Sequence, residues 1–505
     1  MKKFVLLTSL LGLVTLSAFS QVRPYWTISS QSRAGIVTDK SVARLSYPKD
    51  IKLFRLSFAP IQQVLFSVVD RKTASVSAII SLPNAAGNIE EFEVFEASNF
   101  DPALQAQFPD IRAYSGKGIT DKFASLKLSI SPQGIEAMVF RTEKDNEFIE
   151  PYSKDHTIYS VYSAHRDKGS LPWRCTTEDI RMASQIGGKL SALGLTGRST
   201  GDLKTMRLAQ SVTAEYSNYF GATSAAQSSL VLAAINATLS RCNGVYEKDL
   251  AVHLNLIANT TSVFYYNPST DPYDAASTGA GGSWNAQLQN TLTSVIGEAN
   301  YDIGHLFGAS GGGGNAGCIG CICTNGSKGS GFTSPADGIP QGDNFDIDYV
   351  VHEVGHQMGA NHTFSFSNEG TGVNKEIGSG ITIMGYAGIT SQDVAPHSID
   401  IFHEASIAQI QANLATKTCP VTTNIAANNA TPVVATVSNY TIPKSTPFAL
   451  TGSATDANPG DALTYCWEQN DNASSSQTGA NSVASATKAS GPNWISFKPT
   501  TSPTR

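Results

Sequence analysis

One short segment restricts the possible folds of this chain more than any other feature. Residues 351–364 read VHEVGHQMGANHTF and place histidine at positions 352, 356 and 362. Residues four apart lie on one face of an α-helix, so His352 and His356 can direct both imidazoles at one point. Glu353 lies about 100° around the helix from His352, at the edge of the same face. The segment therefore predicts a helix built around one shared point.

The third histidine requires this helix to end. A straight continuation would place His362 about 240° around the axis from His356, on the wrong side. Gly359 stands between them, and glycine adopts the left-handed conformation that ends helices at low cost. We therefore predict a helix that stops at Gly359 and a chain that turns sharply to bring His362 back. The alternative is a buried helix with satisfied core histidines.

The predicted geometry suits a catalytic zinc ion. Zinc in catalytic sites takes three protein ligands and leaves a fourth position for water. We expect His352, His356 and His362 to be the ligands and Glu353 to be the general base that acts on the water. The full pattern HExxHxxGxxH, followed by Met384 in ITIMGYAGI, is the signature of the metzincins.

A resemblance to the metzincin metallopeptidases covers residues 204–421, and it is strongest to the bacterial reprolysin-like, adamalysin-related zinc peptidases. FDIDYVVHEVGHQMGANHTF and GSGITIMGYAGI are similar to their zinc helix and Met-turn, and PALQAQFPDIRAYSGKG is similar to their propeptide. The resemblance implies one catalytic Zn²⁺ and protein or peptide substrates. One departure is Thr363, because adamalysins usually carry an aspartate directly after the third histidine.

The resemblance also implies roles for further residues. Met384 would form an apolar floor beneath the histidines without binding the metal. Tyr386 would be a switchable fifth zinc ligand or an oxyanion donor, or else a buried structural tyrosine. The strand Ile303–Phe307 resembles the edge strand along which metzincins bind an extended substrate, which would place Gly304 and His305 beside the substrate.

The N-terminus predicts export. MKKFVLLTSLLGLVTLSAFSQ has two lysines, an apolar run too short to span a bilayer comfortably, and a small-x-small cleavage site before Gln21. We assign residues 1–20 as the signal peptide of a secreted bacterial protein, in preference to a transmembrane anchor, and expect no later membrane span. Charged residues make up 15% and the net charge is −6, which argues against nucleic acid as a partner. We expect a monomer.

The chain of 505 residues is longer than one domain normally is. Residues 21–198 contain alternating, β-branched runs and are expected to be a mostly β propeptide, released by cleavage near Arg198. A plain β domain joined by a loop is the alternative. Residues 199–425 would be the metzincin domain. Residues 426–505, rich in Thr, Ser, Ala and Pro, would be an incomplete immunoglobulin- or cadherin-like β-sandwich.

The expected fold class is α+β. By resemblance, the metzincin domain is an α/β unit with a twisted, mostly parallel sheet, a zinc helix, a Met-turn and a C-terminal helix. A mostly β prodomain would precede this unit, and a β-sandwich would follow it.

Seven cysteines are present, and export permits disulfides. Cys318, Cys321 and Cys323 lie in one glycine-rich loop, where we favour disulfides over a second zinc site because no nearby fourth ligand completes one. Cys175 precedes the expected cleavage point and would serve as a latency thiolate at the open zinc position. Alternatively, Cys466 is the odd cysteine.

The acidic run GDNFDID at residues 342–348 raises the question of calcium. Its carboxylates suit Ca²⁺ but fit no EF-hand spacing, and they also suit the positive N-terminal end of the zinc helix.

Two functions remain in competition. The first is a secreted zinc endopeptidase made as a zymogen. The second is a catalytically degenerate metzincin scaffold that acts as a secreted protein- or glycan-binding module. A scaffold has no need of a general base, so the presence of Glu353 beside three intact ligands favours the peptidase.

Overall fold

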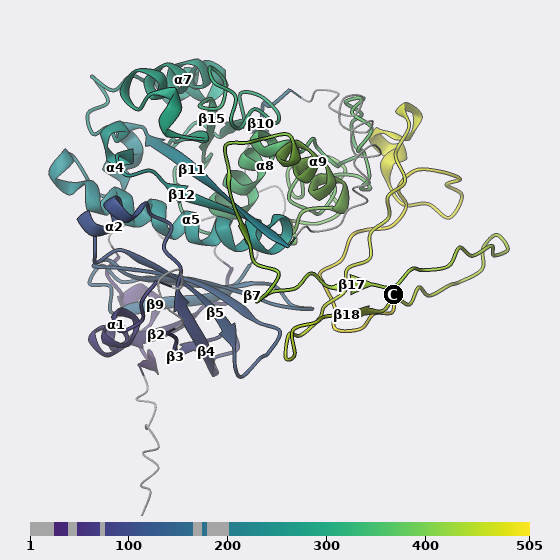
Figure 1. Ribbon diagram of the computed structural model, residues 1–505, viewed down its shortest axis with the longest axis horizontal. Coiled ribbons are helices and arrows are strands. Elements are labelled where there is room, and N and C mark those ends of the chain that lie inside the picture. The colour runs from purple at the N-terminus through teal and green to yellow at the C-terminus, as the bar shows by residue number, and fades with distance from the viewer. Residues whose placement is uncertain (1–24, 39–47, 71–75, 165–173, 179–200) are drawn as a thin grey trace, which may run out of the picture.

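A computed structural model describes residues 25–38, 48–70, 76–164, 174–178 and 201–505 (Figure 1). The expected signal peptide and the expected cleavage point at Arg198 both lie outside the described residues. Within the described part of the chain, no helix is long and apolar enough to cross a membrane.

The N-terminal region is a large antiparallel sheet, as the alternating apolar pattern predicts. The described residues of this region form nine strands in the order β1-β2-β9-β8-β7-β6-β5-β4-β3. The two ends of the sheet approach each other, because the Trp26 Nε1 atom of β1 donates to the Ser81 carbonyl of β3 at 2.8 Å. The strands are β1 (Trp26–Ile28), β2 (Lys52–Leu56), β3 (Ala78–Pro83), β4 (Ile89–Glu96), β5 (Arg112–Gly118), β6 (Ser125–Ser131), β7 (Gly134–Phe140), β8 (Glu147–Pro151) and β9 (Ile158–Ser163).

The second sheet is mixed and mostly parallel, which confirms the prediction for the catalytic region. Its strands run in the order β10-β14-β15-β13-β11-β12, and β16 pairs with β11 in antiparallel fashion. The pairs of β11 with β12 and β13, and of β13 with β15, are parallel. The described strands are β10 (Arg174–Cys175), β11 (Asp202–Val212), β12 (Val252–Leu256), β13 (Ile303–Phe307), β14 (Gly313–Asn315), β15 (Gly331–Ser334) and β16 (Val421–Asn424).

Helices cover both sheets. Those of the described residues are α1 (Phe58–Phe66), α2 (Pro102–Gln107), α4 (Ala214–Tyr219), α5 (Ser228–Leu250), α6 (Ala276–Thr278), α7 (Trp284–Val295), α8 (His352–Met358) and α9 (Glu404–Ala415). Short 3-10 or π-helical turns are η1 (Arg33–Gly35), η2 (Ala225–Gln227), η3 (Thr260–Val263), η4 (Gly279–Ser283), η5 (Glu298–Asn300), η6 (Asn344–Val351), η7 (Ser475–Gln477) and η8 (Gly479–Ser482). η6 leads directly into α8, so the two form one continuous helical path to the histidines.

Helix α5 lies between the two sheets (Figure 1). It packs on β5, β6 and β7 of the N-terminal sheet and on β12 of the second sheet. Side chains of the N-terminal region, among them Phe140 and Phe148, belong to the same buried cluster as Ile235 and Leu239 of α5. The two sheets therefore share one hydrophobic core through this helix.

A buried arginine also joins these parts. Arg241 of α5 is 1% exposed. Its Nη1 atom lies 2.6 Å from Asp346 Oδ2 of η6, and its Nη2 atom lies 2.9 Å from Glu150 Oε1 of β8. Burying three charges costs solvation free energy that only their mutual attraction offsets, so this network depends on all three partners.

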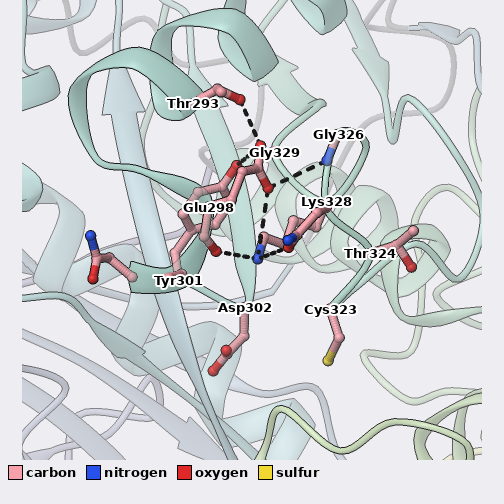
Figure 2. Close-up of polar contacts among 12 residues, drawn as sticks. Thr293, Glu298, Tyr301, Asp302, Cys323, Thr324, Gly326, Lys328 and Gly329 are labelled. Atoms are coloured by element: carbon pink, nitrogen blue, oxygen red, sulfur yellow. Dashed lines mark hydrogen bonds and ion pairs between the residues drawn. The ribbon is translucent and has the colours of Figure 1, made fainter.

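The glycine-rich loop before the zinc helix is fastened by polar contacts and disulfides. Figure 2 shows Lys328 among its partners. Its Nζ atom donates to Asn325 Oδ1 at 2.8 Å and lies 4.7 Å from the centre of the Tyr301 ring. The disulfides join Cys318 to Cys321 and Cys323 to Cys419. The preference for disulfides over a second zinc site is confirmed in this loop.

The expected C-terminal β-sandwich is wrong. Within residues 426–505 the only regular pairing is between β17 (Val433–Val434) and β18 (Ala454–Thr455), although single bridges occur elsewhere. A sandwich is stable because two sheets bury their facing apolar side chains. Here Val433, Val434 and Tyr440 are exposed, so the alternating runs have no opposing layer to pack against.

Candidate active site

The helix and turn around the histidines form as the sequence predicts. Helix α8 ends at Met358, and Gly359 has a φ of 128°. The Gly359 N–H donates to the carbonyls of Gly355 and His356 at 3.0 and 2.9 Å, which closes the helix. The chain then reverses, and the Nε2 atoms of His356 and His362 lie 3.0 Å apart.

All three imidazoles converge on one buried point. The ring centroid of His352 lies 4.8 Å from that of His356 and 5.3 Å from that of His362. One ligand atom from each histidine and the Cys175 sulfur all lie within 4.8 Å of one another. The three histidines are each at most 1% exposed.

The hydrogen-bond partner of each Nδ1 atom fixes the tautomer of the ring. The Nδ1 atoms of His352 and His356 face the carbonyls of Ile383 and Ala360, each at 2.7 Å, and a carbonyl can only accept. The Nδ1 atom of His362 faces Glu369 Oε2 at 3.0 Å. Each Nδ1 atom therefore carries the proton, and each Nε2 atom directs a lone pair toward the centre.

This donor set fits a divalent metal. Burial lowers the pKa of His352 to about 3 and lowers the pKa of His356 well below its usual value, so both rings stay neutral. Lone pairs that face each other at 3.0 Å repel unless a cation lies between them. Ring nitrogens held by outer carbonyl and carboxylate partners are typical of zinc-binding histidines. The residues present therefore fit the zinc ion that the sequence implies.

Glu353 lies beside this point and has an unusual environment. It is fully buried, and burial raises its pKa to about 8. Its Oε2 atom accepts a hydrogen bond from the Thr177 hydroxyl at 3.0 Å. On its other side, a Cβ atom added to Gly314 would lie only 2.4 Å from Glu353 Oε1. Glycine at this point of β14 therefore leaves the space that the carboxylate occupies.

The segment after the third histidine is tied to the Met-turn. The Thr363 N–H donates to the Met384 carbonyl at 3.1 Å. A Cβ atom added to Gly355 would lie 2.8 Å from the Met384 sulfur, so this side chain lies directly beneath the helix that carries His352 and His356. The buried Glu376 carboxylate accepts from the hydroxyls of both Thr363 and Thr382.

A short strand from the N-terminal side covers the site. β10 pairs in parallel with β14, which places Cys175 opposite Gly314. The Cys175 sulfur lies 3.7 Å from His356 Nε2, and the Tyr386 hydroxyl donates to the Cys175 carbonyl at 3.5 Å. The point shared by the histidines is therefore closed by the chain itself.

Comparison with known proteins identifies the region that contains this site. Residues 202–414 match the family described as Metallo-peptidase family M12B Reprolysin-like. They form a reprolysin-like metallopeptidase domain. Among solved structures, the chain is similar to metalloproteinase-II from Bacteroides fragilis, with 9% identity, coverage of 70% of this chain and 95% of that chain, and a TM-score of 0.39. No curated protein matches the chain.

One expectation for the metallopeptidase domain is wrong. β13 was expected to be an edge strand, but it lies inside the sheet between β11 and β15. His305 is buried, with Nδ1 at 2.8 Å from Gln357 Oε1 and Nε2 at 2.9 Å from Thr333 Oγ1. Gly304 and His305 are therefore not placed to contact substrate, and β14 is the strand that borders the site.

The central carboxylate of the acidic run before the zinc helix, Asp346, has its partners within the protein. Asp346 is paired with Arg241 and also accepts from the Thr238 hydroxyl at 2.7 Å. This carboxylate is committed to the buried charge network, and the expectation of calcium receives no support.

Three residues of the metallopeptidase site and its cover were not expected from the sequence: Thr177, Glu369 and Glu376. Glu376 places a buried carboxylate beside Thr363, the residue that follows the third histidine. No spacing rule predicts these residues, because each reaches the site through a loop.

Proposed function

We propose that the chain is a secreted zinc endopeptidase made as an inactive precursor. The observation that carries this proposal is the convergence of three histidine Nε2 atoms on one point with the buried Glu353 carboxylate beside it. Membership of residues 202–414 in the reprolysin-like family supports peptide bonds as the target. The sequence of residues 1–20 supports export.

In this proposal His352, His356 and His362 hold the zinc ion. When bound, the zinc ion would polarise the scissile carbonyl and lower the pKa of water. The Glu353 carboxylate would accept a proton from water and pass it to the leaving amine. Met384 supports the histidines from beneath the helix.

The substrate would lie along β14. An extended peptide can add to an exposed strand by main-chain hydrogen bonds, and β10 makes this kind of contact now. The Thr176 N–H donates to the Gly314 carbonyl at 2.8 Å, and the Arg174 N–H donates to the Gly312 carbonyl at 3.1 Å. Tyr386, released from its contact with Cys175, would donate to the oxygen of the reacting carbonyl.

The precursor would be kept inactive by two side chains of the segment 174–177. Cys175 would occupy the ligand position that substrate and water need. Burial raises the pKa of the Cys175 thiol, but a metal ion beside a thiol favours the thiolate strongly. Thr177 would hold the Glu353 carboxylate through its hydroxyl. Residues 21–198 would then be a propeptide, removed by cleavage near Arg198.

The test compares the purified precursor before and after limited trypsin treatment. We expect one zinc ion bound at the histidines, little casein cleavage before trypsin, and strong cleavage after it. Glu353→Gln should keep this zinc and lose turnover, whereas His356→Ala should lose both. Zinc bound at the histidines without cleavage after any processing would contradict the peptidase and favour the binding module.

Export has its own measurement. The protein should accumulate outside the cell, with an N-terminus at Gln21 in the precursor. Retention inside the cell with residues 1–20 intact would contradict secretion.

A further inference from the structure

A second cluster of possible metal ligands lies away from the three histidines. It consists of Asp348 in η6 and of His397 and Asp400 in the loop that follows the Met-turn. One ligand atom from each of the three lies within 4.8 Å of the others. We propose that Asp348, His397 and Asp400 bind a divalent transition-metal ion in addition to the ion at the histidines.

The chemistry of the three side chains selects the class of ion. Two carboxylates at this separation repel each other, and a divalent cation between them converts that repulsion into attraction. An imidazole with two carboxylates is a nitrogen and oxygen set that suits Zn²⁺, Mn²⁺ or Fe²⁺. Calcium instead takes six to eight oxygen ligands and does not favour the nitrogen of an imidazole. The cluster therefore points to a transition metal.

Outer hydrogen bonds hold the carboxylates in place. Asn146 Oδ1 accepts from the Arg141 N–H at 2.8 Å, which fixes the orientation of the amide. Its Nδ2 atom then donates to Asp400 Oδ2 at 2.6 Å. The Ser398 hydroxyl donates to Asp400 Oδ1 at 3.3 Å. The Ser398 backbone N–H donates to Asp348 Oδ1 at 3.4 Å. Ligating carboxylates in metal sites are commonly oriented by such donors.

An ion can reach the cluster from solvent. A cavity of about 740 Å³ is lined by His397 and Ser398, and also by two acidic and two basic residues, Glu143, Asp145, Lys498 and Arg505. Asp400 lies deeper, at 4% exposure. His397 therefore lines a cavity through which a small ion can approach the buried carboxylate of Asp400.

The position of the site gives it a structural role. Asp348 lies one helical turn before His352, and Asn146 belongs to the N-terminal sheet region. An ion held by Asp348 and Asp400, with Asn146 behind Asp400, would fasten the N-terminal sheet to the helical path that carries the histidines. This inference does not depend on the proposed peptidase activity.

The experiment measures metal content and affinity on the full-length, tag-free chain carrying Glu353→Gln. The protein is stripped with a chelator and titrated with Zn²⁺ and with Co²⁺, and bound metal is counted by mass spectrometry. We expect two ions per chain. His397→Gln and Asp400→Asn should each bind one, and Asp393→Asn, which removes the same charge from the same loop, should bind two.

Two further variants locate the ions. His356→Ala should bind one ion, and His356→Ala with His397→Gln should bind none. Asn146→Ala should weaken the second ion by about 10- to 100-fold. A full-length chain that binds one ion, with His397→Gln unchanged, would overturn the proposal and indicate that the two carboxylates share a proton. Two ions in a folded His397→Gln chain would also overturn it.

Discussion

The hydroxyl of Thr177 should contribute measurably to latency. It donates to Glu353 Oε2 at 3.0 Å and accepts from the Ala316 N–H at 2.8 Å, and both partners are buried. Thr177→Val keeps the shape of the side chain and removes both hydrogen bonds. The precursor in which residues 174–177 cover the site then loses these contacts. When this segment leaves the site, water reaches Glu353 in either variant. We therefore expect the uncleaved precursor to open more often.

The size of the effect follows from the bond types. Burial favours the uncharged form of Glu353, so its hydrogen bond contributes about 0.5–1.5 kcal/mol, and each 1.4 kcal/mol is about a tenfold change in an equilibrium constant. The open population, and with it the activity of the uncleaved chain, should rise by about 2- to 10-fold. Loss of the acceptor for the Ala316 N–H acts in the same direction.

The assay follows hydrolysis of a fluorogenic peptide by precursors that cannot be processed, made with Arg198→Ala. Intact mass confirms that each sample is uncut. Glu178→Gln alters an exposed neighbour and should leave the activity low, and Cys175→Ala should raise it. If Cys175→Ala raises the activity while Thr177→Val matches Glu178→Gln, the hydroxyl has no part in latency and the reasoning fails.

Three other predictions concern the charge network, the glycine of β14 and the outer partner of His362. Arg241→Met leaves the buried carboxylate of Asp346 without its cation and should cost about 3–5 kcal/mol in the free energy of unfolding, measured in urea. Burial already raises the pKa of Asp346, and loss of the arginine raises it further, so the folded state binds the extra proton and the penalty should be smaller near pH 5 than near pH 8. An equal penalty at both pH values would contradict this assignment. Gly314→Ala should keep zinc affinity and lose turnover, because its Cβ atom meets Glu353; normal kinetics would show that the carboxylate can move aside. Glu369→Gln should weaken zinc binding by about 10- to 100-fold in a chelator competition, and unchanged affinity would exclude a role in orienting His362.

Local geometry explains why the histidine segment could be predicted so fully. Helical periodicity fixes the relation between His352 and His356, and the conformational freedom of Gly359 fixes where the helix stops. Both depend on a few adjacent residues, so no knowledge of the rest of the chain is needed.

The position of β13 in its sheet depends on distant residues, so the sequence of the strand does not predict it. A strand pattern shows that Ile303–Phe307 is extended, but the neighbours of a strand are set by the topology of the whole sheet. All five residues of β13 are buried. Strands covered on both faces usually lie in the interior of parallel sheets.

The residues that reach the site through loops belong to no sequence pattern that could predict their position. Glu369 and Thr177 reach the site only after the chain has folded back, and neither belongs to a periodic pattern.

In the C-terminal segment, the sequence pattern instead predicts more regular structure than the chain forms. The segment's alternating residues predict several strands, but only the short pair β17 and β18 forms, and no second layer covers them.

The core shared across α5 has a consequence for how the precursor would be activated. Cleavage near Arg198 breaks one peptide bond but leaves Phe140 and Phe148 packed with Ile235 and Leu239. Separation of the two pieces would expose this apolar surface to water and leave Arg241 without Glu150. The first product of cleavage would therefore be a nicked two-chain protein that still holds together. Its rate of coming apart, and not the rate of cutting, would set when enzyme activity begins.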